Sequence, residues 1–354
     1  MAYVLGGASN EADGFTKAIA GFALRAMHES SGLVDMTTVV SPNQGNQFLV
    51  PNFAPITYQD YAPQQFQGGN AAVRGDGFAA APGAVEQNPA LDQREITATP
   101  AVAATAFDVF YSWTTSFELA ATLGAELGES YAEKVDQRVC KAFLDFKATP
   151  ANSNYAVSAD GFTRTLELGA IELMGEGATL SANATPGFTT NSVLELVRLV
   201  KQNYKKARLP GNPTIVLDSD GVDPEEGQSS LTRLLAELTG GAVSQSGGSN
   251  LSALGNELLS TGQIESVYGC RIMFTTFLPT AERTIMGVAE QDVLVGSYFH
   301  DSALFTVLKE GLQIKMGEKP GGLQMWLTGL AYMGAGVGDR RRGGAINIHQ
   351  EQSA

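Results

Sequence analysis

The sequence predicts an α+β protein organised around one long helix, and three observations support this class. Residues 112–147 carry apolar side chains at a helical period. The C-terminal third alternates short apolar runs with glycines, which is the pattern of strands and turns. Helical and strand-like segments are mixed, without the regular strand–helix alternation of parallel α/β folds.

The long helix is predicted over residues 112–147, and Pro150 ends the pattern. Its apolar positions are Trp113, Phe117, Ala120, Leu127, Tyr131, Val135, Val139 and Phe143. At 1.5 Å per residue the helix would be about 50 Å long. Gly124 and Gly128 each weaken it by about 1 kcal/mol relative to Ala, so packing must hold it. It is either an ordinary core or coiled-coil helix, or a spine that other segments lie across.

Residues 36–90 have a different character, because they hold almost no charge and no apolar period long enough to form a core. Their charged side chains are Asp60, Arg74, Asp76 and Glu86. The segment is either disordered or an arm ordered by contacts with another chain. Disordered segments are poor in aromatic residues, so its aromatic side chains favour the arm. They are Phe48, Tyr58, Tyr61, Phe66 and Phe78.

The remaining elements follow from shorter patterns of the same two kinds. Helices are expected at residues 10–29, 164–174, 191–207 and 230–238. Strands are expected at residues 47–50, 56–58, 95–111, 213–217, 262–279, 284–288, 303–308 and 323–332. Pro100 places its strand at a sheet edge or a bulge.

The composition limits the classes of function. The chain has 354 residues, of which 44 % are hydrophobic and 17 % charged, below the typical quarter. A net charge of -14 argues against tight binding of nucleic acid by phosphate neutralisation, but not against enclosing it. Two cysteines make no disulfide framework. No apolar run is long enough for a membrane span, and no signal peptide is expected.

Active-site signals are scarce, and we expect no catalytic site, metal or cofactor. The sequence lacks the G-x-S-x-G, GxxxxGK and GxGxxG motifs. His28, His300 and His349 are scattered, without metal-ligand spacing. The neighbours His300 and Asp301 would point to opposite faces of a strand, which favours a structural histidine over a catalytic one.

The only basic run is three arginines near the C-terminus, and we expect it at an interface or in a solvated turn rather than on phosphates. Together with the aromatic residues of the uncharged segment, these arginines are the candidates for contacts in an assembly. They are Arg340, Arg341 and Arg342.

Two stretches in the last third carry a resemblance to a known family. The first reads G-x-I-x-x-V-x-G-x-x-I at residues 262–272, followed by Phe277-Leu278-Pro279. The second runs from Tyr332-Met-Gly334 through Val337 and Asp339 to Ala345-Ile346-Asn347-Ile348. In this order, after a long helix and an out-and-back arm, they resemble the major capsid protein of tailed bacteriophages, which has the HK97-like fold. The motifs cover residues 255–350, and the architecture covers nearly the whole chain.

The resemblance implies a division of the chain into the parts of that fold. They are an N-terminal arm (1–44), an extended E-loop reaching a neighbouring subunit (45–111), a peripheral domain with the spine helix (112–209), an axial domain (210–285), returning peripheral strands (286–340) and a C-terminal tail (341–354). The loop at residues 240–250 would line the centres of hexamers and pentamers.

The resemblance also implies a function. The chain would self-assemble as hexamers and pentamers into an icosahedral virion shell that encloses double-stranded DNA, after synthesis in the host cytoplasm. Some family members cross-link an E-loop lysine to a neighbour's asparagine, but this sequence has no lysine between Lys17 and Lys134. We therefore expect a shell held by noncovalent contacts, with room for a cement protein. No long helical extension is expected before the arm, so the resemblance also implies a separate scaffold protein.

Three alternatives stand beside this interpretation. An encapsulin-like nanocompartment would use the same subunit to enclose an enzyme. An enzyme on an unrelated α+β fold would use His300, Asp301 or Cys270. An adhesin or decoration protein would suit the glycine-rich loops but not the long helix.

Overall fold

The computed structural model describes most of the chain outside its termini and several connecting segments. The described residues are 18–19, 21–23, 25, 32–42, 45–53, 91–108, 116–149, 155–157, 163–165, 168–174, 188–207, 209–219, 229–231, 233–234, 237, 266–285, 288–318 and 324–349. The chain divides into two compact units: Leu49–Glu95, and a main unit made of Met1–Phe48 and Ile96–Ala354. Each unit is considered by itself.

The described elements mix helices with runs of consecutive strands and show no βα repeat. In chain order they are η2 (Val34–Met36), β1 (Thr38–Val40), β2 (Gln47–Phe53), β3 (Leu91–Thr97), β4 (Thr99–Asp108), α4 (Ser116–Ala142), η5 (Phe143–Asp145), β5 (Tyr155–Val157), β6 (Thr163–Thr165), β7 (Ile171–Leu173), β8 (Thr189–Thr190), α5 (Val193–Lys206), β9 (Thr214–Asp218), β10 (Arg271–Thr275), β11 (Thr280–Ile285), β12 (Val288–Phe299), β13 (Leu304–Glu318), β14 (Gln324–Val337), η6 (Arg340–Arg342) and β15 (Gly343–Ile348).

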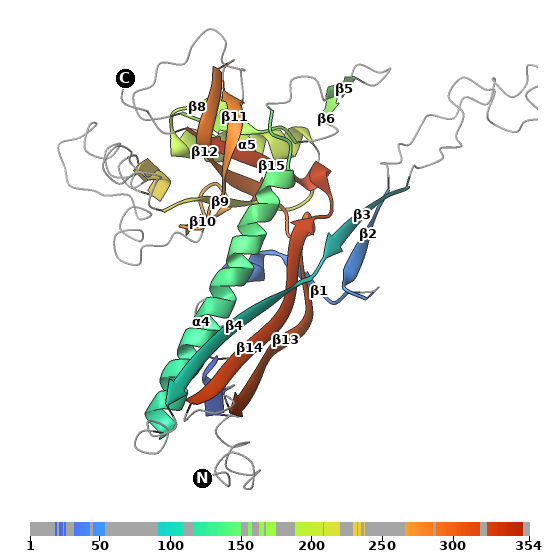
Figure 1. Ribbon diagram of the computed structural model, residues 1–354. Helices are drawn as coiled ribbons and strands as arrows, with labels where there is room; N and C mark the ends of the chain where they lie inside the picture. The colour runs from blue at the N-terminus through green and yellow to red at the C-terminus, as the bar shows by residue number, and fades with distance from the viewer. Residues whose placement is uncertain are drawn as a thin grey trace, which may run out of the picture. The chain divides into compact units, whose positions relative to one another are not determined.

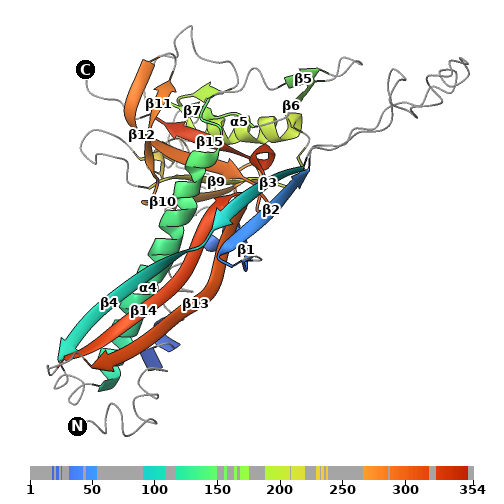
Figure 2. The same cartoon turned by 45° about the vertical axis from the view of Figure 1, so that its right-hand side comes forward.

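A four-stranded sheet lies along α4 in the main unit (Figures 1 and 2). Its strand order is β1-β13-β14-β4, with β13, β14 and β4 antiparallel and β1 parallel to β13. Leu127 of α4 and Leu327 of β14 pack in one small cluster with Ile19. The sheet therefore has one face on α4 and one face turned away from it.

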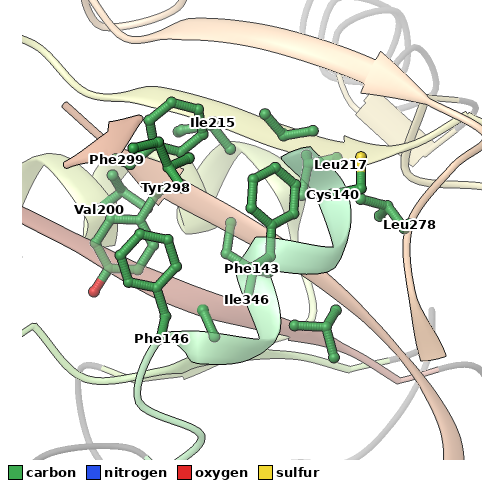
Figure 3. Close-up of a cluster of buried hydrophobic side chains, with 14 of the residues drawn as sticks. Cys140, Phe143, Phe146, Val200, Ile215, Leu217, Leu278, Tyr298, Phe299 and Ile346 are labelled. Carbon is green, nitrogen blue, oxygen red and sulfur yellow. The ribbon is translucent and has the colours of Figure 1, made fainter. Parts of the chain in front are cut away.

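The main core lies beside the C-terminal end of α4 (Figure 3). It is built on a second sheet with the order β10-β9-β12-β15-β7-β8, to which β11 adds through β12. The Phe143 ring lies 5.9 Å from that of Phe299. The rings of Tyr204 and Tyr298 meet edge to face at 6.1 Å. These aromatic contacts join the last turn of the long helix, α5 and the sheet into one core.

The long helix is confirmed over Ser116–Ala142 and continues as the short 3-10 helix η5. Its buried apolar side chains recur at the predicted positions Leu127, Tyr131, Val135, Val139 and Phe143. Residues 109–115 lie outside the described part. Because one end of this helix packs on the four-stranded sheet and the other enters the main core, the spine interpretation is confirmed.

Three shorter predictions, about α5, β9 and Pro100, are also confirmed. Helix α5 begins after Ser192, whose side chain accepts the Glu195 amide hydrogen as an N-cap. The predicted short strand is β9, buried along its whole length. Pro100 lies on β4, which is the edge strand of its sheet. Among the described residues, no helix is both long and apolar enough to cross a membrane.

One prediction about local structure is wrong. The helix expected at residues 164–174 is replaced by strands β6 and β7. Ile171 pairs with Ile346 of β15 and is fully buried, so sheet pairing with a distant segment overrides the local helical pattern. For the run of strands expected at 262–279, residues 262–265 are outside the described part. In the described part, the turn that the glycines predicted is Val267–Cys270, and Arg271–Thr275 is the strand β10.

Candidate assembly surface

The face of the four-stranded sheet that points away from α4 exposes apolar side chains. Along β14, Leu327, Ala331 and Met333 are buried on the α4 side. Trp326 belongs to the opposite face and is 47 % exposed. Val102 on β4 lies directly across from Leu330 of β14 and is 63 % exposed. Large apolar groups that stay in water on one face of a sheet indicate a surface made for a partner.

The register of the strands gives the composition of this outer face. Ala106 pairs with Trp326, Ala104 with Thr328, and Val102 with Leu330. On the other side of β14, Lys315 pairs with Thr328. We call the set Val102, Ala104, Ala106, Trp326, Thr328 and Leu330 the outer sheet face. It carries no charge of its own, and Lys315 lies at its border.

The end of this face nearer the second sheet is covered by the chain itself. A side chain at Gly334 would meet the backbone of Thr97, and one at Gly336 would meet Ile96. Lys309 lies over the Tyr332 ring at 5.6 Å and donates a hydrogen bond to Asn46. The uncovered part of the face is therefore the stretch from Trp326 to Leu330 with its β4 neighbours.

The edge of the sheet beside this face is also open, and a groove of about 210 Å³ runs between β4 and α4. Leu127 and Tyr131 line its floor, with Lys134 and Arg138 along the helix. Arg138 donates hydrogen bonds to the carbonyl oxygens of Thr99, at 3.0 Å, and Met333, and burial lowers its pKa. An edge strand presents unpaired backbone groups to any second strand.

The predicted aromatic contacts are only partly described. The Phe48 ring is half-buried and lies 5.9 Å from the ring of Phe305 on β13. It therefore has a partner within its own chain. Tyr58, Tyr61, Phe66 and Phe78 lie outside the described residues.

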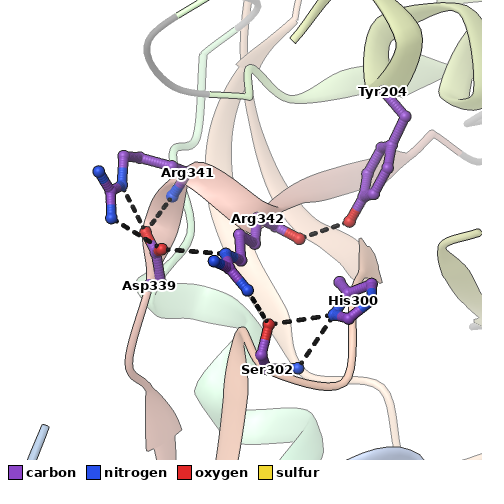
Figure 4. Close-up of polar contacts among 6 residues, drawn as sticks. All are labelled: Tyr204, His300, Ser302, Asp339, Arg341 and Arg342. Atoms are coloured by element: carbon purple, nitrogen blue, oxygen red, sulfur yellow. Dashed lines mark hydrogen bonds and ion pairs between the residues drawn. The ribbon is translucent and has the colours of Figure 1, made fainter. Parts of the chain in front are cut away.

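The arginine run forms η6, and its ion pairs stay within the chain (Figure 4). Arg341 donates to both carboxylate oxygens of Asp339, at 2.9 and 3.0 Å, and Arg342 lies 3.4 Å from the same carboxylate. Arg342 also donates to the Ser302 hydroxyl at 2.6 Å. Burial raises the pKa of Asp339, but the hydrogen bonds and charges of the arginines outweigh it, so the net shift is downward. Arg340 is exposed.

The three side chains considered for an enzyme, His300, Asp301 and Cys270, differ in their surroundings. His300 Nδ1 accepts the Ser302 amide hydrogen at 3.3 Å and lies 3.0 Å from the Ser302 hydroxyl (Figure 4). Asp301 is exposed, and its backbone carbonyl accepts from the Thr38 hydroxyl. Cys270 is fully buried, and burial raises the pKa of its thiol, which favours the unreactive protonated form. No group of metal-binding side chains is found in the described part of the chain.

Sequence reasoning missed the outer sheet face, although its signal was present. Trp326, Thr328 and Leu330 follow one another at a period of two, as one face of a strand does. Which face α4 covers cannot be read from this period alone. The exposed side of β14 therefore became clear only once the packing of the helix was known.

Comparison with known proteins identifies the fold. No family model matches the chain, and no curated protein matches its sequence. The capsid of cyanophage P-SCSP1u matches the structure with a TM-score of 0.57 at 14 % identity, covering 91 % of this chain and 89 % of that one. The capsid of an empty GTA particle matches with 0.55 at 11 %, covering 90 % of both. The mature capsid of bacteriophage PhiM1 matches with 0.53 at 17 %, covering 90 % and 87 %.

These matches cover almost the whole length of each chain. The mixed helix-and-sheet architecture is thus the HK97-like fold of phage capsid shells, as the sequence motifs predicted.

Proposed function

We propose that the chain is the major shell protein of a tailed-phage capsid. Copies assemble as hexamers and pentamers into an icosahedral virion shell around double-stranded DNA. The observation that supports this best is the capsid fold, which spans about nine-tenths of this chain and of the capsid chains it matches. In this role the chain is a structural protein, not an enzyme.

The exposed surfaces of the monomer support assembly with other copies of itself. Covering the outer sheet face would remove the Trp326 and Val102 side chains from water, and each square ångström of apolar surface removed stabilises the assembly by about 25 cal/mol. The occupant we propose is the part of the E-loop of a neighbouring copy that forms a separate unit, Leu49–Glu95. A surface on one subunit that meets a different surface on the next produces closed rings.

The division into parts belongs to the same proposal. It comprises an N-terminal arm (1–44), an E-loop (45–111), a peripheral domain (112–209, with strands at 286–340), an axial domain (210–285) and a tail (341–354). The separate compact unit Leu49–Glu95, which falls inside the E-loop range, supports this division.

The partners follow from charge and composition. The net charge of -14 repels packaged DNA from the shell wall, which keeps the DNA free to move in and out. Without an E-loop lysine the shell is held by noncovalent contacts. A separate scaffold protein guides assembly, and a cement protein can reinforce the finished shell. Synthesis takes place in the host cytoplasm.

Electron microscopy of the purified chain tests the proposal. We expect closed shells, or rings of five and six, in negative stain. Particles from the natural source should contain DNA that nuclease cannot reach. A protein cargo in place of DNA would favour the encapsulin-like alternative, whereas a compact monomer that stays monomeric with its scaffold would contradict both.

A further inference from the structure

A second exposed aromatic residue lies far from the outer sheet face, on the turn that leads into β10. Val267 and Cys270 form an isolated antiparallel bridge, and Tyr268 and Gly269 form the turn between them. Both turn residues have positive φ angles, 51° and 75°. Glycine adopts this backbone easily, but an aromatic residue rarely does. The tight turn holds Tyr268 outward, with 64 % of its surface exposed.

The turn lies beside a basic surface on α5. A side chain at Gly269 would lie 3.6 Å from Lys201 Nζ. Tyr268 also lies near Arg198. Arg198, Lys205 and Lys206 are exposed on the same helix. We call Tyr268 with Arg198, Lys201, Lys205 and Lys206 the α5 basic patch.

This patch is unusual in a chain that carries 37 acidic and 23 basic residues. The most acidic stretch in the sequence follows β9: residues 219–226 read SDGVDPEE, and no lysine or arginine occurs between Arg208 and Arg233. Asp218, the last residue of β9, is buried and accepts hydrogen bonds from Ser230, so it is not part of this stretch. Opposite charges of this kind steer two surfaces together and disfavour other pairings. An aromatic side chain at the centre of such a contact supplies apolar area that the charges do not.

We propose that the α5 basic patch is a contact between subunits, and that it receives the acidic segment 219–226 of a second copy. This inference rests on the proposed shell function and adds a specific contact to it. Because the two surfaces are different parts of the same chain, the contact is head-to-tail, and repeating it produces a ring of subunits. Tyr268 is the anchor, and the lysines pair with the carboxylates around it.

The other partner that basic and aromatic side chains suit is nucleic acid. The acidic segment is favoured by the charge of the chain. The cations number only four, and the rest of the chain is strongly acidic.

Cysteine cross-linking tests the contact, since both native cysteines are buried and unreactive. The full-length variant with Tyr268→Cys and Glu225→Cys is oxidised after assembly, and its products are separated on a non-reducing denaturing gel. We expect a ladder that ends at five or six subunits. Mixing the two single variants should give dimers, because one cysteine comes from each subunit. Lys141→Cys, on an exposed turn of α4, replaces Tyr268→Cys in the control and should give no ladder.

The outcomes separate this inference from the shell function. If particles form but the double variant gives only a faster-running monomer, the two segments meet within one chain and the inference is wrong. If Lys205→Glu with Lys206→Glu lowers the DNA content of particles without weakening the ladder, the patch faces DNA and the inference is also wrong. If the wild-type chain forms no particles or rings under any condition, the shell function itself fails.

Discussion

Asp136 is a buried carboxylate on α4 whose charge the fold tolerates poorly. It is 6 % exposed, and one of its oxygens has no hydrogen-bond partner. Burial raises its pKa from 3.8 to about 6, although the backbone amides of Gly32 and Leu33 donate to it and oppose the rise. Burial disfavours the charged form, so the folded state is most stable when Asp136 is protonated. This contribution to the free energy of unfolding is fully present below pH 3.8 and is lost as the pH rises through about 6.

Replacing this residue by a neutral one should therefore stabilise the subunit at neutral pH. We expect Asp136→Asn to raise the free energy of unfolding at pH 7.5 by about 1–2 kcal/mol and to remove the pH dependence between about 4 and 6. Urea unfolding of unassembled chain at several pH values measures both. Glu133→Gln, exposed one turn earlier on α4, should change neither. An unchanged pH profile in Asp136→Asn would show that Asp136 does not titrate in this range.

Asp339 has the opposite linkage, because its pKa is lowered. The charged Asp339 carboxylate contributes to the free energy of unfolding at pH values above its ordinary pKa of 3.8. This contribution is lost as the pH falls through the pKa of the folded state, in the acid range below about 4. Asp339→Asn should cost about 1–3 kcal/mol at pH 7, because Arg341 and Arg342 lose a shared partner. Arg340→Ala, at the exposed position of η6, should change stability by less than about 0.5 kcal/mol. Equal losses in the two variants would argue against the ion-pair network.

At the scale of elements, a glycine decides how the N-terminal helical residues pack on α4. A Cβ at Gly124 would lie 2.7 Å from Phe22 Cβ and 2.8 Å from the Ile19 carbonyl oxygen. The sequence marked Gly124 as a weak point of the helix, but the structure shows that it permits this close approach. Helix propensity and packing therefore favour different residues at this position.

Two matched substitutions separate these effects. Gly124→Ala should weaken the docking of the N-terminal segment despite its better helix propensity, because two helices must move apart. Gly21→Ala, where nothing lies within 4 Å, should stabilise the segment by up to about 1 kcal/mol. Hydrogen exchange of the amides at residues 18–25 reports the difference. Slower exchange in both variants would contradict the close-packing account.

The elements that could be predicted from the sequence are those whose signal lies within the element. The long helix shows its buried stripe from Leu127 to Phe143, and the strand β9 is an uninterrupted apolar run. The strand β7 could not be predicted, because Ile171 is buried by pairing with Ile346, about 170 residues away. For the same reason, the outer sheet face could not be predicted from the sequence, because the side of β14 that stays exposed depends on how α4 packs.

At the scale of the whole molecule, the outer sheet face should matter for assembly and not for folding. Trp326 is half-exposed, so Trp326→Glu should leave the stability of the unassembled chain within about 0.5 kcal/mol. It should reduce the yield of particles at least tenfold, because a charge would be buried under the neighbouring subunit. Sedimentation gives the yield, and Lys141→Glu is the control for a change of charge elsewhere. If Trp326→Glu assembles normally, the outer sheet face is not part of the interface between subunits.

The covalent state of the shell is a further property of the whole assembly. The sequence has no lysine between Lys17 and Lys134, so we expect intact particles to dissociate completely to monomers on a denaturing gel. A ladder of covalent oligomers under reducing conditions would show that another residue forms a cross-link.

A cryo-electron microscopy reconstruction of assembled particles tests the account most directly. We predict closed shells in which a neighbouring copy of the chain covers Val102, Trp326 and Leu330 on the outer sheet face. Closed shells in which this face remains in contact with solvent would contradict the proposed mode of assembly.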